Sequence, residues 1–91
     1  MLEYCRLYVG QHVPMNRVTE QLDQFEYRRV GHVADPGDFA LRGGILDIFP
    51  ATFESPLTVE FSGHQISSMR SFNPKTLQTQ DRHTMAVILP R

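Results

Sequence analysis

The chain reads DFALRGGILDI from Asp38 to Ile48, and this stretch predicts a β-hairpin. Two apolar runs flank Gly43-Gly44, and a two-residue Gly-Gly loop suits a type I′ turn, which needs positive φ at both centres. The expected cross-strand pairs are Arg42 with Ile45, Leu41 with Leu46, Ala40 with Asp47 and Phe39 with Ile48. Because side chains alternate between the two faces of a strand, one apolar set faces the core while Arg42, Ile45 and Asp47 share the opposite face, on which Ile45 is expected to be exposed.

The sequence around this hairpin predicts one helix and further strands. Val18, Leu22 and Phe25 follow one another at spacings of four and three, which indicates a helix from about Arg17 to Glu26 with Asn16 as its N-cap. Such a short helix must pack on other elements. Strands are also expected at residues 4–9, 30–33, 57–61, 65–70 and 85–89, with a turn at 62–64. We therefore predict an α+β fold, with one N-terminal helix packed on a mostly antiparallel sheet built from β-hairpins.

The length and charge of the chain narrow the function classes. A chain of 91 residues supports a single core, so we expect one domain over residues 1–91. No apolar run is long enough to cross a bilayer and no signal pattern opens the sequence, so a cytoplasmic location is expected. The net charge of −1 argues against bulk attraction to DNA. Eight of the nine basic residues are Arg, which suits interfaces but which a GC-rich genome would also produce.

The search for catalytic chemistry is largely negative. The sequence contains neither G-x-x-x-x-G-K-[ST] nor G-x-G-x-x-G, the two glycine-rich motifs that bind phosphate groups. Its single cysteine, Cys5, lies in a predicted strand and is interpreted as a buried structural thiol. The four histidines lack metal-ligand spacing, so we expect no metal and no cofactor. Asp47 has no second carboxylate spaced as a catalytic partner, and we expect it to pair with an Arg or a backbone donor.

The segment from Tyr27 to Pro50 closely resembles one shared by the transcription-repair coupling factor (Mfd) and the excision-repair subunit UvrB. Its Arg-Gly-Gly-Ile-Leu-Asp-Ile-Phe-Pro run fits the family pattern Arg-Gly-x-x-x-[Asp/Glu]-[Ile/Leu]-Phe-Pro and is nearer to the coupling factor. The likeness extends over nearly the whole chain. Further matches are Val59 to Gly63, Ile66 to Phe72, Pro74 with Thr76, and Ile88 to Pro90.

The resemblance implies a UvrB-type interaction domain, whose partner in the family is the damage-recognition protein UvrA. In that family other domains carry the ATPase and the DNA tracking. We therefore expect an adaptor and not an enzyme. We also expect a module excised from a larger multidomain ATPase, whose full-length form contacts UvrA, DNA, RNA polymerase and its own other domains.

The resemblance also suggests which residues bind the partner. The Arg of the family's Tyr-x-Arg falls on Arg29, and the Arg before the Gly falls on Arg42; Arg28 and Ile45 are weaker candidates. The sequence leaves open whether Arg42 pairs with Asp47 instead of with a partner.

Two positions depart from the family pattern. Ala40 stands where UvrB carries a further Arg, and Glu26 stands where the family has a Gly that ends the helix. A left-handed cap at that position would be strained by Glu, so a different local turn is expected.

Two other functions remain open from the sequence. A direct nucleic-acid-binding domain would use Arg29 and Arg42, together with Tyr27 and Arg28, and would bind in a salt-dependent way. A structural spacer between flanking domains would have no partner.

Overall fold

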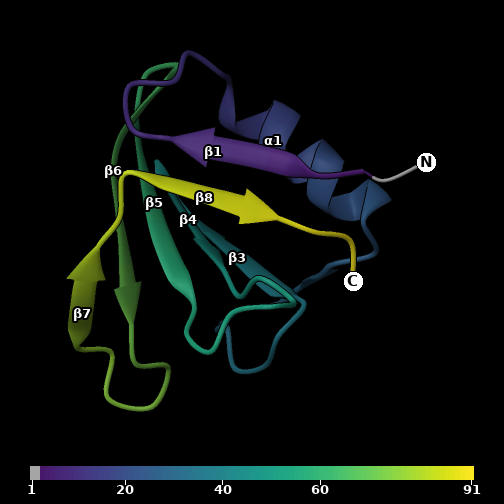
Figure 1. Ribbon diagram of the computed structural model, residues 1–91, viewed down its shortest axis with the longest axis vertical. Coiled ribbons are helices and arrows are strands. Elements are labelled where there is room, and N and C mark those ends of the chain that lie inside the picture. Colours follow the sequence, from purple (N-terminus) through teal and green to yellow (C-terminus); the bar gives the residue numbers. More distant parts are fainter. Residues whose placement is uncertain (1–2) are drawn as a thin grey trace.

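The computed structural model describes residues 3–91 and contains a six-stranded sheet covered on one face by a helix and a separate two-stranded ribbon (Figure 1). The sheet follows the order β2-β3-β4-β5-β6-β7. Neighbouring strands are antiparallel except for the parallel β2–β3 pair. The strand bounds are β2 Arg28–Arg29, β3 Asp38–Arg42, β4 Ile45–Ile48, β5 Leu57–Ser62, β6 Gln65–Phe72 and β7 Thr79–Arg82.

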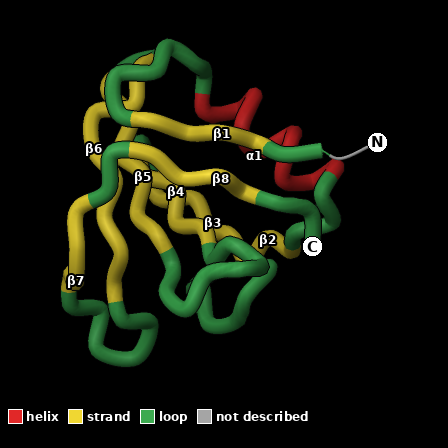
Figure 2. Tube along the Cα trace, in the orientation of Figure 1, coloured by secondary structure: helices red, strands yellow, loops and turns green. Residues whose placement is uncertain are grey.

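The covering layer combines the two ends of the sequence. Helix α1 spans Met15–Gln24, and the ribbon pairs β1 (Cys5–Tyr8) with β8 (Met85–Ile88) in antiparallel register. Figure 2 shows the ribbon crossing in front of the sheet, with the helix beside it. The predicted α+β class, with an N-terminal helix packed on a mostly antiparallel sheet, is confirmed.

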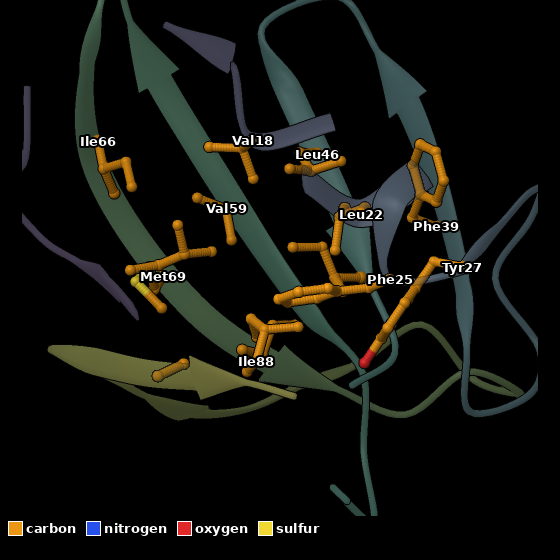
Figure 3. Packing of buried hydrophobic residues seen from close by; sticks show 14 residues of the cluster. Val18, Leu22, Phe25, Tyr27, Phe39, Leu46, Val59, Ile66, Met69 and Ile88 are labelled. Carbon is orange, nitrogen blue, oxygen red and sulfur yellow. The ribbon is translucent and has the colours of Figure 1, made fainter. Parts of the chain in front are cut away.

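A single main core lies between the sheet and this covering layer. The predicted helix stripe of Val18, Leu22 and Phe25 is buried and meets side chains from every central strand (Figure 3). Each fully buried Leu, Ile or Phe contributes roughly 1.5–3 kcal/mol. The core side chains of the sheet and the ribbon are Leu7, Phe39, Leu46, Ile48, Leu57, Val59, Ile66, Met69, Ala86 and Ile88.

The central hairpin has the register that its sequence predicts. Phe39 pairs with Ile48, Ala40 with Asp47, Leu41 with Leu46 and Arg42 with Ile45. Gly43 has φ +61°, but Gly44 does not have a positive φ, so the turn is not the predicted type I′, which needs positive φ at both centres. The second hairpin joins β5 to β6, with a register shift between Glu60 and Phe61. Local turn chemistry therefore determined the central pairing.

Two local expectations in this part of the chain were wrong, and one strand was not predicted. Asn16 lies inside α1, because the helix begins earlier and Pro14 occupies the N-cap position without a side-chain hydrogen bond. Residues 30–33 form no strand. Val30 N–H still donates to Phe39 O, but the chain then leaves the sheet. The next backbone N–H groups with a side-chain acceptor are those of Ala34 and Asp35, which donate to the carboxylate of Asp38. Strand β7 was not predicted, because all four of its residues are exposed and carry no apolar alternation.

The end of α1 keeps a left-handed cap in spite of its residue. Glu26 has φ +66°, and its N–H donates to Asp23 O at 3.0 Å, while Tyr27 N–H donates to Leu22 O at 3.0 Å. These two bonds make a Schellman motif, in which the residue at the Glu26 position is most often Gly. The expectation of a different turn was wrong, because these bonds and the packing of Tyr27 on the core hold the backbone in place.

Tyr27 then ties the helix end to the rest of the fold. Its hydroxyl donates to Leu89 O at 2.9 Å and accepts from Ala51 N–H at 2.8 Å. Burial raises the pKa of Tyr27, although the bond from Ala51 acts in the opposite direction. Among the described residues, no helix is long and apolar enough to cross a membrane.

Candidate interaction face

The sheet face turned away from α1 and the ribbon carries the predicted site residue Arg42, and we call it the outer face. Strand pairing aligns Ala40, Asp47, Thr58 and Arg70 across β3 to β6, and aligns Arg42, Ile45, Glu60 and Ser68 beside them. Since core residues such as Leu46 and Val59 occupy the alternate positions, these two rows point away from the core. The outer face therefore presents mainly polar side chains, while Ala40 on β3 is buried with Val33 and Phe49 in a small apolar cluster of its own.

Arg42 and Asp47 form a two-contact ion pair across the hairpin. Arg42 Nε lies 3.0 Å from Asp47 Oδ2, and Arg42 Nη2 lies 3.3 Å from Asp47 Oδ1. Thr58 Oγ1 donates to the same Oδ1 at 3.0 Å. The Asp47 side chain is 11% exposed and that of Arg42 is 53% exposed. The pairing that the sequence left open is therefore present within the chain, and it leaves half of the Arg42 side chain facing solvent.

This geometry fixes the orientation of the Arg42 guanidinium. The hydrogen bond and the negative charge of Asp47 raise the pKa of Arg42, so the side chain stays cationic. A guanidinium carries five N–H donors, and two of them are used on Asp47. Three donors remain for acceptors outside the domain.

A second ion pair lies on the same face, across β5 and β6. Arg70 Nη2 donates to Glu60 Oε1 at 2.6 Å, and Arg70 Nη1 donates to Ser68 Oγ at 3.3 Å. The hydrogen bond from Arg70, followed by its charge, lowers the pKa of Glu60. Both side chains are about one third exposed. The outer face thus presents two arginines that are each held by a carboxylate.

The outer face is hollowed between two loops. The hollow, of about 460 Å³, has Arg42, Asp47, Thr58 and Arg70 among the side chains that line it. One loop contributes His32 and Val33, and residues 72–79 border the other side. Three cationic side chains line the hollow, Arg42, Arg70 and Lys75, and Asp47 is the carboxylate among the lining residues. Such a hollow favours an anionic group over a cationic one.

The structure separates the other predicted residues. Arg28 lies beside Asp38, with Arg28 Nη2 3.5 Å from Asp38 Oδ1, and its side chain is 65% exposed. Arg29 is exposed and pairs in register with Phe39, a core residue. That register puts Arg29 on the opposite side of the sheet from Arg42, at the β2 edge. Ile45 is half-buried beside Arg42, whereas we expected it to be exposed.

Sequence reasoning did not identify Thr58, Glu60 and Arg70. The signal was present, because Thr58 and Glu60 alternate with apolar residues along β5. However, their position beside Arg42 depends on the pairing of β4 with β5. Residues 49–56 connect these two strands, and this loop is too long for its sequence to fix which residues pair. The tertiary structure was needed to find them.

Two observations on residues 3–91 bear on metal and thiol chemistry. No group of three or more His, Cys, Asp or Glu side chains that could hold a metal ion occurs among residues 3–91. Cys5 is half-buried, and burial raises the pKa of its thiol, which disfavours the reactive thiolate. What the outer face offers is oriented charge and hydrogen-bond donors, which suit recognition.

Comparison with known proteins places this geometry in a family. A family model described as the UvrB interaction domain matches residues 5–91. The chain belongs to the UvrB interaction domain family. The match includes the helix, both sheets and the outer face, so the resemblance recognised in the sequence is confirmed over the whole fold.

Relatives with this domain are much longer proteins. The transcription-repair-coupling factor of Mycobacterium tuberculosis is 40% identical over 94 residues, which cover 100% of this chain and 8% of that protein. The proteins of the same name from Bacillus subtilis and Escherichia coli are 37% and 33% identical, over 74% and 89% of this chain and 6% and 7% of their own lengths. The chain therefore spans less than a tenth of these relatives, and their names agree with the likeness to the coupling factor.

Proposed function

We propose that this domain is a non-catalytic protein-binding module that recruits UvrA in transcription-coupled DNA repair, and that it forms one part of a larger cytoplasmic repair ATPase. The observation that carries the proposal is Arg42, which Asp47 holds in one orientation with three donors free. A rigid hairpin and a fixed side chain reduce the entropy lost on binding. The family to which the chain belongs is named for interaction, which supports a protein partner.

The site in this proposal is the outer face around Arg42. Ile45 packs beside Arg42 and supplies apolar contact, and Arg28 lies at the same face with its ion pair to Asp38. Arg29 lies on the opposite side of the sheet edge, so it can contact the same partner only if the partner wraps around β2. We therefore assign Arg42 the larger share of the binding free energy.

The test is a titration of UvrA against the folded chain and three single variants. Arg42→Gln removes the oriented cation and is expected to weaken binding by about 30-fold, which corresponds to roughly 2 kcal/mol for an anchoring Arg. Arg29→Gln is expected to have a smaller effect. Arg17→Gln changes an exposed Arg on α1 and serves as the matched control, with unchanged affinity expected.

The possible outcomes separate the function from the site. Absence of binding at tens of micromolar by the folded wild-type chain would reject UvrA as the partner of the isolated module. Equal binding by wild type and Arg42→Gln would reject only the site. A steep fall of DNA affinity with salt, without UvrA binding, would instead favour the nucleic-acid alternative. Thermal melting of each variant checks that the fold is retained.

A further inference from the structure

The outward side of the β1–β8 ribbon is an apolar and aromatic surface that the proposed function does not use. Along β1 the side chains alternate, so that Leu7 is buried while Arg6 and Tyr8 are exposed. Along β8, Ala86 and Ile88 are buried while Met85 and Val87 are exposed. The register pairs Arg6 with Val87 and Tyr8 with Met85. We call the exposed set Tyr4, Arg6, Tyr8, Met85 and Val87 the ribbon face.

This surface carries four of the six large apolar side chains that are most exposed among residues 3–91. Among residues 3–91, the large apolar side chains with the greatest exposure are Tyr4 at 59%, Tyr8 at 41%, Val9 at 40%, Leu77 at 70%, Met85 at 53% and Val87 at 36%. All except Leu77 lie on the ribbon or directly beside it. Scattered exposed apolar residues are ordinary, but a contiguous group of them marks an interaction site.

The composition of the ribbon face resembles that of a protein interface. Tyr, Met and Arg are the residue types enriched in interfaces, and neither ribbon strand contains an acidic residue. The Arg6 guanidinium carbon lies 5.7 Å from the centre of the Tyr8 ring, which keeps the two side chains together. In Figure 1 the ribbon lies across the inner side of the sheet, so the ribbon face and the outer face point in opposite directions.

The free edge of β1 is closed, so docking there would use the face and not strand addition. Gln11 Oε1 accepts from Tyr8 N–H at 3.1 Å, and Gln11 Nε2 donates to Arg6 O at 3.3 Å. The Gln11 amide therefore occupies the backbone groups that an added strand would need. Side-chain contact is what remains available on this side of the ribbon.

The size of the ribbon face favours an occupant that is covalently linked. A stable complex between separate proteins needs roughly 20–30 residues on each side, whereas the ribbon face supplies the few side chains named above. A domain on the same polypeptide has an effective concentration near millimolar through a short linker, so a much smaller contact is enough. Cys5 pairs with Ile88, so segments that precede β1 and follow β8 would leave the ribbon at the same end.

We propose that the ribbon face is the docking surface for a neighbouring domain of the same polypeptide. The coupling factors similar to this chain carry more than nine-tenths of their length outside the matched segment, which supplies such domains in those relatives. The neighbouring domain presents an apolar surface to Tyr8, Met85 and Val87, with an acceptor for Arg6. This inference rests on the proposal that the domain is one part of a larger protein, but it does not depend on the identity of the outer-face partner.

The experiment measures side-chain oxidation of Met85 by peroxide, in the 91-residue chain and in the polypeptide encoded by the complete reading frame around it. Oxidation follows exposure, so Met85 is expected to react about tenfold more slowly in the longer polypeptide. Met69, which is 2% exposed, reports in both samples that the domain is folded. Peptide mass spectrometry resolves the two sites.

Two variants of the longer polypeptide sharpen the test. Val87→Lys puts a charge in the centre of the ribbon face and is expected to return Met85 to the rate of the 91-residue chain, while Met69 stays protected. Thr79→Lys makes the same change at an exposed position of β7 and is expected to leave Met85 protected.

Several outcomes would overturn the proposal. Equal Met85 rates in the two polypeptides would do so, as would a reading frame confined to these residues. Protection that appears in the 91-residue chain as its concentration rises would indicate a second copy. Protection of the longer polypeptide that requires an added protein would indicate a separate partner.

Discussion

The outer face of the sheet and the ribbon face arise from the same alternation of side chains around one core, yet they differ in chemistry. On the outer face Arg42 and Arg70 are each held by a carboxylate on a neighbouring strand. On the ribbon face the exposed side chains are mainly apolar, and Arg6 rests on an aromatic ring. Paired charges fix geometry and give specificity, whereas exposed apolar area gives affinity with little discrimination. The contrast suits an adaptor that selects one partner and is attached to another.

Among the substitutions that test this contrast, Asp47→Ala on the outer face should cause the largest loss of stability. Asp47→Ala removes a buried carboxylate that accepts from Arg42 and Thr58, so we expect a loss of about 2 kcal/mol in the free energy of unfolding. The measurement is urea denaturation. Asp81→Ala, at an exposed position of β7, is the control and should stay within about 0.5 kcal/mol of wild type. Equal effects of the two substitutions would show that the Asp47 pair adds nothing.

Glu26 lies outside both faces, and its substitution should change the free energy of unfolding by an intermediate amount. Glu26→Gly removes the cost of φ +66° for a residue with a side chain, and we expect a gain of about 1 kcal/mol in the free energy of unfolding. Glu26→Ala keeps a Cβ and should not produce this gain. A destabilised Glu26→Gly variant would contradict the strain that we assign to this cap.

A smaller effect is expected at the second ion pair of the outer face. The pKa of Glu60 is lowered by Arg70, so its stabilising contribution is present above the unfolded pKa of about 4.3 and is lost as the pH falls through the lower folded value. Because both side chains are about one third exposed, the contribution should remain under about 1 kcal/mol. Glu60→Gln should flatten the loss of stability in this acid range when melting is followed against pH. An unchanged acid profile would contradict the prediction.

The smallest effect should come from the ribbon face. Met85 is 53% exposed, so Met85→Gln in the 91-residue chain should change the free energy of unfolding by less than about 0.5 kcal/mol. The measurement is the same urea denaturation. A loss above about 1 kcal/mol would show that Met85 supports the core, and the contrast between the two faces would then be weaker.

Local pattern explains why some elements were predictable and others were not. The β3–β4 register followed from Gly43-Gly44, because a two-residue turn leaves a single pairing. The segment after Arg29 was misjudged, because its backbone bonds go to the side chain of Asp38 and not to a strand. Strand β7 was missed, because an edge strand exposed on both faces has no apolar period.

The sequence by itself determined the fold class, the central hairpin and the family, since these depend on turn residues, apolar spacing and a motif within short stretches of chain. It also placed Arg42 and Asp47 on one face. Only the tertiary structure decided that Arg70 and Glu60 lie beside them, that Arg29 lies on the other side of the sheet, and that the first and last strands form an exposed ribbon. Those features require contacts between segments far apart in the chain, and the burial that selects such contacts is a property of the whole core.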